Sequence, residues 1–239
     1  MPAQQLNLAL SLADDTLFDN FLTSPQSIRQ QVLLALKNLF EEGVNLPANS
    51  NVLLWGGVGS GLTHLLQAAC HEAVSRGQSI QYLPLEAMLS YPPQDVLQGL
   101  AECELVCLDN LHVAVGVPEW EEALFHLFNE VMAAGGRLLM SANAAPRALS
   151  FTLADLESRL AASTVFQLPQ YSEADKADIV QFRAARLGLN MSEDALGFLL
   201  NRAPRDIHSL IDLLHRLDTF ALQQKSRVTI PLMKKAFGW

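Results

Sequence analysis

Short apolar runs alternate with amphipathic stretches along most of the chain. Continuous apolar runs predict buried strands, and apolar residues spaced three or four positions apart predict helices. The predicted strands are 51–55, 79–83, 105–108, 137–141 and 164–168, and the predicted helices are 26–42, 62–76, 93–101, 119–134 and 152–162. Short apolar strands separated by helices indicate a parallel sheet of the α/β class, with helices on both faces.

The pattern changes after Pro169, where only helical periodicity follows. Ser172 and Asp175 form a helix-capping pattern. Helices are predicted from this cap to about 187, after 192, from about 204 to 222, and after 231. We therefore expect a flexible tail over 1–22, an α/β core over 23–170, and a small all-helical domain over 171–239.

A glycine-rich segment joins the first predicted strand to the next helix. Its residues are Gly56, Gly57, Val58, Gly59, Ser60, Gly61, Leu62, Thr63 and His64. They match the phosphate-binding pattern G-x-x-x-x-G-K-[ST], except that Leu62 replaces the lysine that reaches the β- and γ-phosphates. Amide N–H groups of the loop and the helix N-terminus suit an anion, and Thr63 is placed for Mg²⁺. The segment predicts nucleotide binding with poor hydrolysis, and a plain glycine-rich turn is the alternative.

Polar residues end two further predicted strands. Asp109 follows 105–108, and in P-loop proteins an aspartate there holds Mg²⁺ directly or through water. A turn or helix cap is the alternative role for Asp109. Asn110 comes next, and an amide cannot act as the base that activates water. Asn143 follows 137–141, where it either orients water or a phosphate oxygen or is an ordinary loop amide.

Two arginines are candidates for phosphate contacts. Arg159 lies near the end of the predicted helix 152–162, and Arg205 follows Pro204 at the start of another. A guanidinium forks onto phosphate oxygens and stays charged. The alternative for each is a solvated surface ion pair, worth about 0–1 kcal/mol.

Composition narrows the function classes. The net charge of −9 and the absence of any Lys/Arg run argue against a general affinity for nucleic acid. Cys70, Cys103 and Cys107 have no metal-ligand or C-x-x-C spacing, so we expect reduced thiols. The N-terminal residues show no basic stretch followed by an apolar run, and no apolar run reaches the roughly 18 residues of a membrane helix. We therefore expect no signal peptide and a cytoplasmic protein without a membrane partner.

Together these motifs resemble one family. The phosphate loop, the segment 16–21 and the Ser-Arg-Leu segment around Arg159 are similar to the AAA+ core of the bacterial replication initiator DnaA, over nearly the whole chain. The resemblance implies an AAA+ P-loop core with a five-stranded parallel sheet and a helical lid domain. It also implies that Arg159 is an arginine finger, Asn143 the sensor-1 residue and Arg205 the sensor-2 arginine. The initiator continues into a helix-turn-helix domain, whereas this sequence stops at Trp239, so we expect no specific DNA binding.

The N-terminal segment 5–10 resembles the peptide by which such proteins bind the β sliding clamp of DNA polymerase III. In that case the clamp contacts are Gln5, Leu6, Leu8 and Leu10. Burying two leucines contributes about 3–6 kcal/mol before ordering costs, which suits a moderate affinity. A tail without a partner and an edge strand are the alternatives.

The resemblance implies a conditional activator rather than an autonomous enzyme. The chain would bind a nucleoside diphosphate, ADP in this family, with or without Mg²⁺. Docked on the DNA-loaded clamp, it would project Arg159 into the nucleotide site of an ATP-bound DnaA and stimulate hydrolysis there, which limits replication initiation. An autonomous P-loop ATPase, a DNA-binding factor and a scaffold with an unused nucleotide site are the alternatives. Both a monomer and a homodimer stay open.

Overall fold

The computed structural model describes residues 15–41 and 51–239, and the chain divides into two compact units between Pro169 and Gln170. The elements of the first unit are η1 (Phe18–Asn20), α1 (Ile28–Asn38), β1 (Val52–Gly56), α2 (Leu62–Ser75), β2 (Ile80–Pro84), α3 (Leu85–Met88), α4 (Pro93–Leu97), η2 (Leu100–Glu102), β3 (Leu105–Asp109), η3 (Leu111–Ala114), α5 (Pro118–Ala133), β4 (Arg137–Ala142), η4 (Pro146–Ala148), α6 (Ala154–Ala161) and β5 (Thr164–Leu168). Strands and helices alternate, as the apolar pattern predicts.

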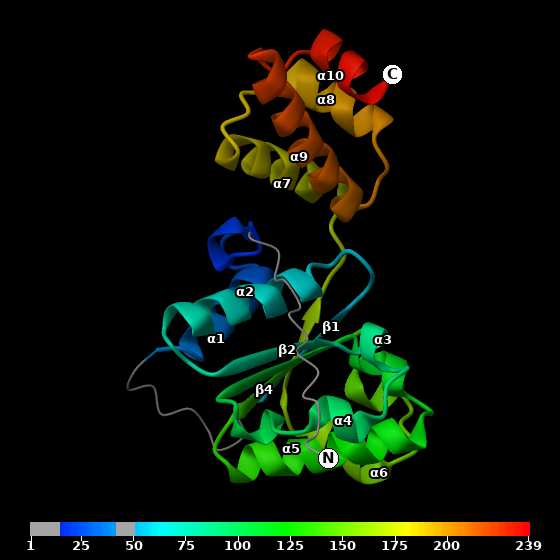
Figure 1. Cartoon of the computed structure of the whole chain (residues 1–239). Coiled ribbons are helices and arrows are strands. Elements are labelled where there is room, and N and C mark those ends of the chain that lie inside the picture. Colours follow the sequence, from blue (N-terminus) through cyan, green and yellow to red (C-terminus); the bar gives the residue numbers. More distant parts are fainter. Residues whose placement is uncertain (1–14, 42–50) are drawn as a thin grey trace. The chain divides into compact units, whose positions relative to one another are not determined.

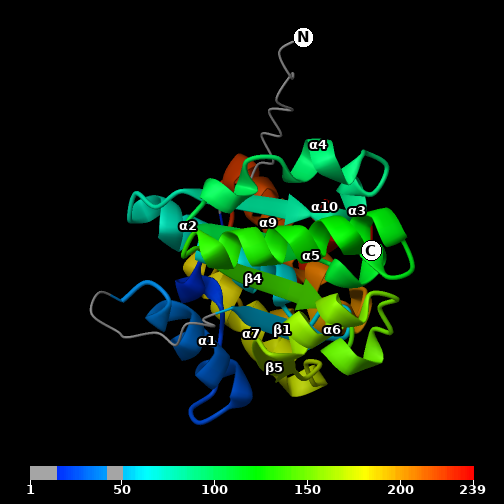
Figure 2. The same ribbon diagram turned by 90° about the horizontal axis from the view of Figure 1, so that it is seen from below.

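The strands form one five-stranded sheet in the order β2-β3-β4-β1-β5. All four neighbouring pairs are parallel, which confirms the predicted fold class. Figure 2 shows β4, β1 and β5 as successive neighbours beneath α5. Because the strands are parallel, the loops that follow β1, β3 and β4 emerge at the same edge of the sheet, where open α/β sheets bind ligands.

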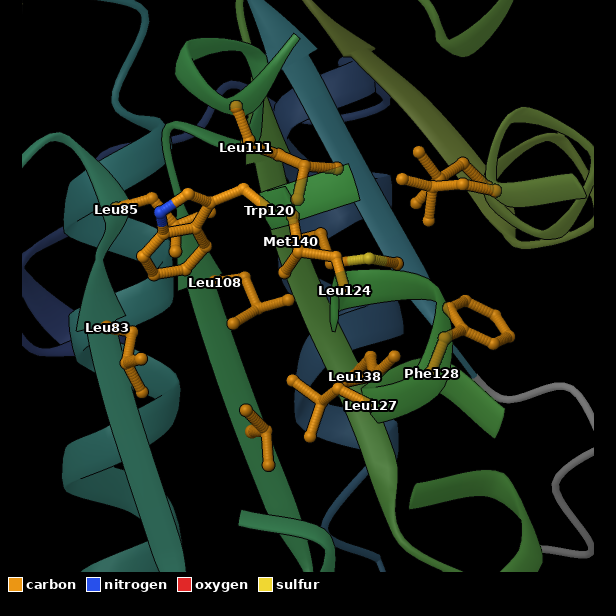
Figure 3. Close-up of a cluster of buried hydrophobic side chains, with 14 of the residues drawn as sticks. Leu83, Leu85, Leu108, Leu111, Trp120, Leu124, Leu127, Phe128, Leu138 and Met140 are labelled. Atoms are coloured by element: carbon orange, nitrogen blue, oxygen red, sulfur yellow. The ribbon is translucent and has the colours of Figure 1, made fainter. Parts of the chain in front are cut away.

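Helices cover both faces of this sheet (Figure 1). On one face α1 and α2 pack against Leu105 and Cys107 of β3. On the other, α3 to α6 pack against Val106 and Leu108. Figure 3 shows Leu108 in this cluster together with the buried Trp120. Successive β3 side chains thus enter two different cores, which explains why this strand is apolar throughout rather than alternating.

Two predicted helices of the first unit are shorter than expected. The predicted helix 93–101 ends at Leu97, because Gln98 leaves the helical conformation (ψ 127°) and Gly99 takes the left-handed φ of 79°. The predicted helix 26–42 begins at Ile28, because Ser27 is its N-cap: the Ser27 side chain accepts a hydrogen bond from the Gln30 backbone N–H. The short α3 was not predicted, since its four residues are too few to show helical periodicity.

The second unit contains α7 (Glu173–Arg186), α8 (Glu193–Arg202), α9 (Ile207–Gln224) and α10 (Ile230–Phe237). In each, the side chain before the first residue accepts an amide of the first turn; the caps are Ser172, Ser192, Asp206 and Thr229. Because Asp206 caps α9, that helix starts at Ile207 and Arg205 precedes it. Within the described ranges, no helix is both long and apolar enough to cross a membrane.

Candidate functional site

The glycine-rich loop runs from the end of β1 to the start of α2. Gly59 and Gly61 have φ values of 79° and 97°, a left-handed conformation that glycine adopts without strain. A Cβ added at Gly56 would lie 2.5 Å from the Leu168 carbonyl oxygen and 2.8 Å from Ser60 Oγ, so only glycine fits there. The loop therefore turns tightly into the N-terminus of α2, whose first N–H groups have no partner within the helix.

An arginine of α1 holds this loop against the end of β5. Arg29 donates to the Ser60 carbonyl at 3.0 Å and also to the Pro169 carbonyl, although its side chain is buried. Ser60 is 1% exposed, and its hydroxyl oxygen has no hydrogen-bond partner within the described structure. The curvature of the loop is thus fixed by a buried guanidinium as well as by glycines.

Asp109, at the end of β3, is the centre of the site. Its carboxylate is only 2% exposed. Oδ2 accepts the Thr63 hydroxyl at 2.8 Å and the Tyr82 hydroxyl at 2.7 Å, and Oδ1 accepts the Ser141 hydroxyl. These three donors come from α2, β2 and β4, so the structure brings the phosphate loop and Asp109 together.

The Tyr82 hydroxyl is a permanent donor in this arrangement. Burial and the negative charge of Asp109 raise the pKa of Tyr82 far above its usual value, so the phenol stays protonated. Gln67 of α2 lies beside it, with Nε2 3.5 Å from the phenol oxygen, and accepts the Thr16 hydroxyl at 3.1 Å. The hydrogen bonds thus extend from Asp109 to the segment that enters the unit.

A Mg²⁺ ion at this site would be bound by the nucleotide phosphates and Thr63 rather than directly by Asp109. A carboxylate accepts about four hydrogen bonds, and Asp109 already accepts three while buried, so it has little capacity for direct ligation. In the described part of the chain, no three His, Cys, Asp or Glu side chains gather as metal ligands. Thr63 is exposed, so its hydroxyl oxygen and the phosphates would hold the ion, with Asp109 contacting its waters.

The residues on either side of Thr63 have different surroundings. Leu62 is half-buried and packs against the apolar cluster beneath α1 and α2. His64 Nε2 lies 3.0 Å from the Leu17 carbonyl oxygen, and its ring packs on Phe21 with centroids 5.6 Å apart. Leu62 thus contributes apolar packing where the pattern has an ammonium, and His64 holds the entering segment. Val58, at the tip of the loop, is 96% exposed.

Sequence reasoning named Asn143 after β4, but the β4 residue that reaches Asp109 is Ser141. Asn143 is exposed, whereas Ser141 is fully buried. The Ser141 hydroxyl oxygen also accepts a hydrogen bond from the Asn110 backbone N–H at 2.8 Å. Tyr82 was not predicted either. A hydroxyl within a predicted strand was the available signal for both, because a buried hydroxyl needs a partner.

The two candidate arginines lie in different units. Arg159, in the last turn of α6, is exposed, and no ion pair to it is found among the described residues. Leu156 and Leu160 anchor the other side of that helix. Arg205 is exposed in the second unit, where Lys176 and then Arg205 lower the pKa of Glu173. The predicted clamp contacts Gln5, Leu6, Leu8 and Leu10 lie outside the described residues.

Glu121 of α5, which sequence reasoning did not single out, fixes the start of α6. It is 1% exposed and accepts the Gly116 amide at 2.7 Å, the Thr152 hydroxyl at 2.6 Å and the Leu153 amide at 2.8 Å. Leu153 precedes α6 and offers no side-chain cap, so Glu121 supplies the cap from another helix. Burial raises the pKa of Glu121, but the Thr152 hydroxyl and backbone amides outweigh it, and the pKa is lowered.

Changing Glu121→Gln should lower the free energy of unfolding at pH 7 by about 1.5–3 kcal/mol, because an amide cannot accept all three bonds. A lowered folded-state pKa stabilises the protein above the usual pKa of 4.5, and that stability is lost as the pH falls below it. The difference between wild type and variant in urea unfolding should therefore shrink below pH 4.5. The exposed neighbour Glu122→Gln is the control. An equal loss of unfolding free energy at pH 7 and below pH 4.5 would contradict this role.

Comparisons with known proteins agree with this geometry. The family described as the bacterial DnaA ATPase domain matches residues 12–167, and that described as the lid domain of Hda matches residues 173–237. Domain III of the Thermotoga maritima initiator DnaA has a similar fold, with a TM-score of 0.75 and 20% identity over 95% of this chain and 98% of that one.

Two further solved structures are similar. AMPPCP-bound DnaA from Aquifex aeolicus has a TM-score of 0.70 and 21% identity, over 90% of this chain and 69% of that one. A replication initiator DnaA bound to AMPPCP and single-stranded DNA has a TM-score of 0.68 and 19% identity, over 94% and 80%. These likenesses show the fold, and the matched families cover both units. The chain therefore belongs to the DnaA family of AAA+ proteins, as a DnaA homologue of the Hda type.

Proposed function

We propose that this chain is a nucleotide-bound regulator that inactivates the initiator DnaA by supplying an arginine finger in trans. The observation that carries the proposal is the contrast between two sites in one unit. The phosphate loop lacks its lysine, whereas Arg159 stands exposed and without a carboxylate partner among the described residues, on a helix that is held rigidly. Arg159 is thus a solvent-exposed cation that another protein can reach.

The chain's own site holds a nucleoside diphosphate, ADP by family. Loop amides from Gly56 to His64 surround the phosphates, and the helix dipole of α2 adds to them. The family resemblance assigns Arg205 a phosphate contact as the sensor-2 arginine, and Asn143 follows β4 at the same edge of the sheet as the loop. Losing the lysine removes a charge-assisted contact of about 1.5–3 kcal/mol, which penalises a triphosphate more than a diphosphate.

The same site is poorly equipped for hydrolysis. Asn110 follows Asp109 where hydrolysing relatives carry an acid, and its amide cannot take a proton from water. Asp109 accepts hydrogen bonds from three hydroxyl groups, and the buried Glu121 accepts the Leu153 backbone N–H at the start of α6. Neither carboxylate is available as a general base. The nucleotide is therefore a structural ligand in this proposal, and the chain is not an autonomous enzyme.

The reaction takes place in the partner. Gln5, Leu6, Leu8 and Leu10 dock on the DNA-loaded β sliding clamp, which raises the effective concentration of the chain near the initiator. Arg159 then enters the nucleotide site of ATP-bound DnaA and stabilises the charge that develops on the transferred phosphoryl group. An arginine finger supplied in trans is worth about 10³–10⁵ in rate, or about 4–7 kcal/mol of barrier.

Changing Arg159→Ala should abolish the stimulation of initiator ATP hydrolysis, with a loss of at least about 10³-fold. The measurement is conversion of DnaA-bound ATP to ADP in the presence of clamp loaded on DNA. Arg147→Ala, an exposed arginine of the same unit, is the matched control and should keep full activity. Gln5→Ala should lose activity only at low protein concentration, where docking limits the reaction.

The same assay separates the rival functions. A scaffold that only links clamp and initiator would keep full activity with Arg159→Ala. An autonomous P-loop ATPase would hydrolyse ATP without DnaA or clamp. Either outcome would replace the arginine-finger proposal.

We further expect ADP binding to depend weakly on Mg²⁺, because Tyr82 occupies an oxygen of Asp109 that metal-bound waters would use. Chelating Mg²⁺ should change the wild-type Kd for ADP by less than about threefold. Tyr82→Phe frees one acceptor position of that oxygen, which still accepts the Thr63 hydroxyl, so the variant's affinity in Mg²⁺ should rise by about tenfold over its affinity in chelator. Calorimetry measures both, with the exposed Tyr91→Phe as control. A wild-type affinity that collapses without Mg²⁺ would refute this expectation.

A further inference from the structure

The negative charge of the chain is unevenly distributed. Residues 170–239 hold ten of the 16 lysines and arginines but only eight of the 25 acidic residues. After Asp218 the sequence contains Lys225, Arg227, Lys234 and Lys235 and no acidic side chain. An overall charge of −9 therefore conceals a basic region in the second unit.

Part of that region is a contiguous cluster of rings and cations on α8, α9 and α10. The Trp239 ring packs on Phe237 with centroids 4.7 Å apart and on Phe198 at 5.9 Å. Arg202 and Lys234 lie 5.8 Å and 5.7 Å from the Phe198 centroid, and Arg216 lies 5.3 Å from that of Phe237. We call the following six residues the Trp239 cluster: Phe198, Arg202, Arg216, Lys234, Phe237 and Trp239.

The three cations of the cluster are exposed, and no ion pair to any of them is found among the described residues. Asp212, one turn before Arg216 on α9, lies 3.5 Å from His208 instead. Contact with a ring face satisfies part of each cation but leaves N–H donors turned to solvent. The cluster is thus a set of positioned donors without an anion.

The surroundings favour a polyanion over a folded protein partner. Protein interfaces centre on exposed aromatic or apolar anchors that become desolvated. Here the rings are half-buried beneath their own cations, and Leu222 is the only large apolar side chain of this unit that is strongly exposed, within the described residues. Phosphate oxygens can bind to the exposed cations without an apolar anchor, and duplex DNA presents one negative charge per roughly 1.7 Å of its axis.

Charges farther than about 10 Å from the cluster are screened at 0.1 M, so the net charge of −9 does not by itself set the field at the cluster. We propose that the Trp239 cluster binds the phosphate backbone of duplex DNA without reading its sequence. Backbone contacts position a protein but carry no sequence information. The inference stands independently of the arginine finger, since it concerns other residues and can be tested on the chain alone.

The experiment is anisotropy of a short labelled duplex titrated with the full chain between about 50 mM and about 200 mM NaCl. Three phosphate contacts predict a slope of about −3 in log K against log salt. Arg216→Gln combined with Lys234→Gln should weaken binding at least about tenfold at the lower salt and reduce the slope by about 2.

Matched variants keep the test independent of net charge and folding. Lys37→Gln with Arg147→Gln makes the same charge change on the first unit and should alter affinity by less than about threefold. Arg216→Lys keeps the charge and should keep binding, and thermal melting verifies that each variant folds.

Several results would overturn the proposal. The wild type could fail to bind duplex at low salt, or both variant pairs could lose affinity equally. Tighter, cluster-dependent binding of single strands would indicate base stacking rather than backbone contact. Cluster-dependent binding of polyglutamate with no binding of DNA would assign the surface to an acidic protein segment.

Discussion

A buried carboxylate that must be hydrogen-bonded organises the functional edge of this protein. Asp109 is almost inaccessible to water, and a charge in that position is tolerated only when donors surround it. Thr63, Tyr82 and Ser141 provide them from three different elements. The same bonds fix the start of α2 beside β2 and β4, so the geometry of the phosphate loop depends on the solvation of one acid. On the other side of the loop, the buried guanidinium of Arg29 donates a hydrogen bond to the Ser60 carbonyl oxygen.

Much of this arrangement could be predicted because it leaves local signals. Apolar runs and helical spacing located every strand of the sheet, and the glycine pattern located the loop, since only glycine tolerates its φ angles and close approach to β5. Ser141, Tyr82 and Glu121 escaped prediction because their roles depend on partners far away in sequence. A serine or tyrosine within a strand and a glutamate in the first turn of a helix have ordinary local explanations. Only the folded sheet shows which of them solvates a charge or caps another helix.

The departures from an ATPase then form one consistent picture. Leu62 packs into an apolar cluster, Asn110 offers no base, and Asp109 is largely satisfied by the protein itself. In our proposal each of these features works against hydrolysis, whereas the amide cradle is kept. Glu121 meanwhile holds the start of the helix that carries Arg159. In our proposal the catalytic group of this DnaA-family protein acts in its partner, and its own nucleotide maintains the structure.

The most direct test of this account is the fate of nucleotide on the pure chain, without initiator or clamp. The chain would be mixed with ATP labelled at the γ-phosphate and, separately, with labelled ADP, and both bound nucleotide and released phosphate would be measured over time. The account predicts stoichiometric binding of ADP and no phosphate release above the buffer blank. Sustained phosphate release that disappears in an Asp109→Asn variant would contradict it, because the site would then hydrolyse what we propose it only holds.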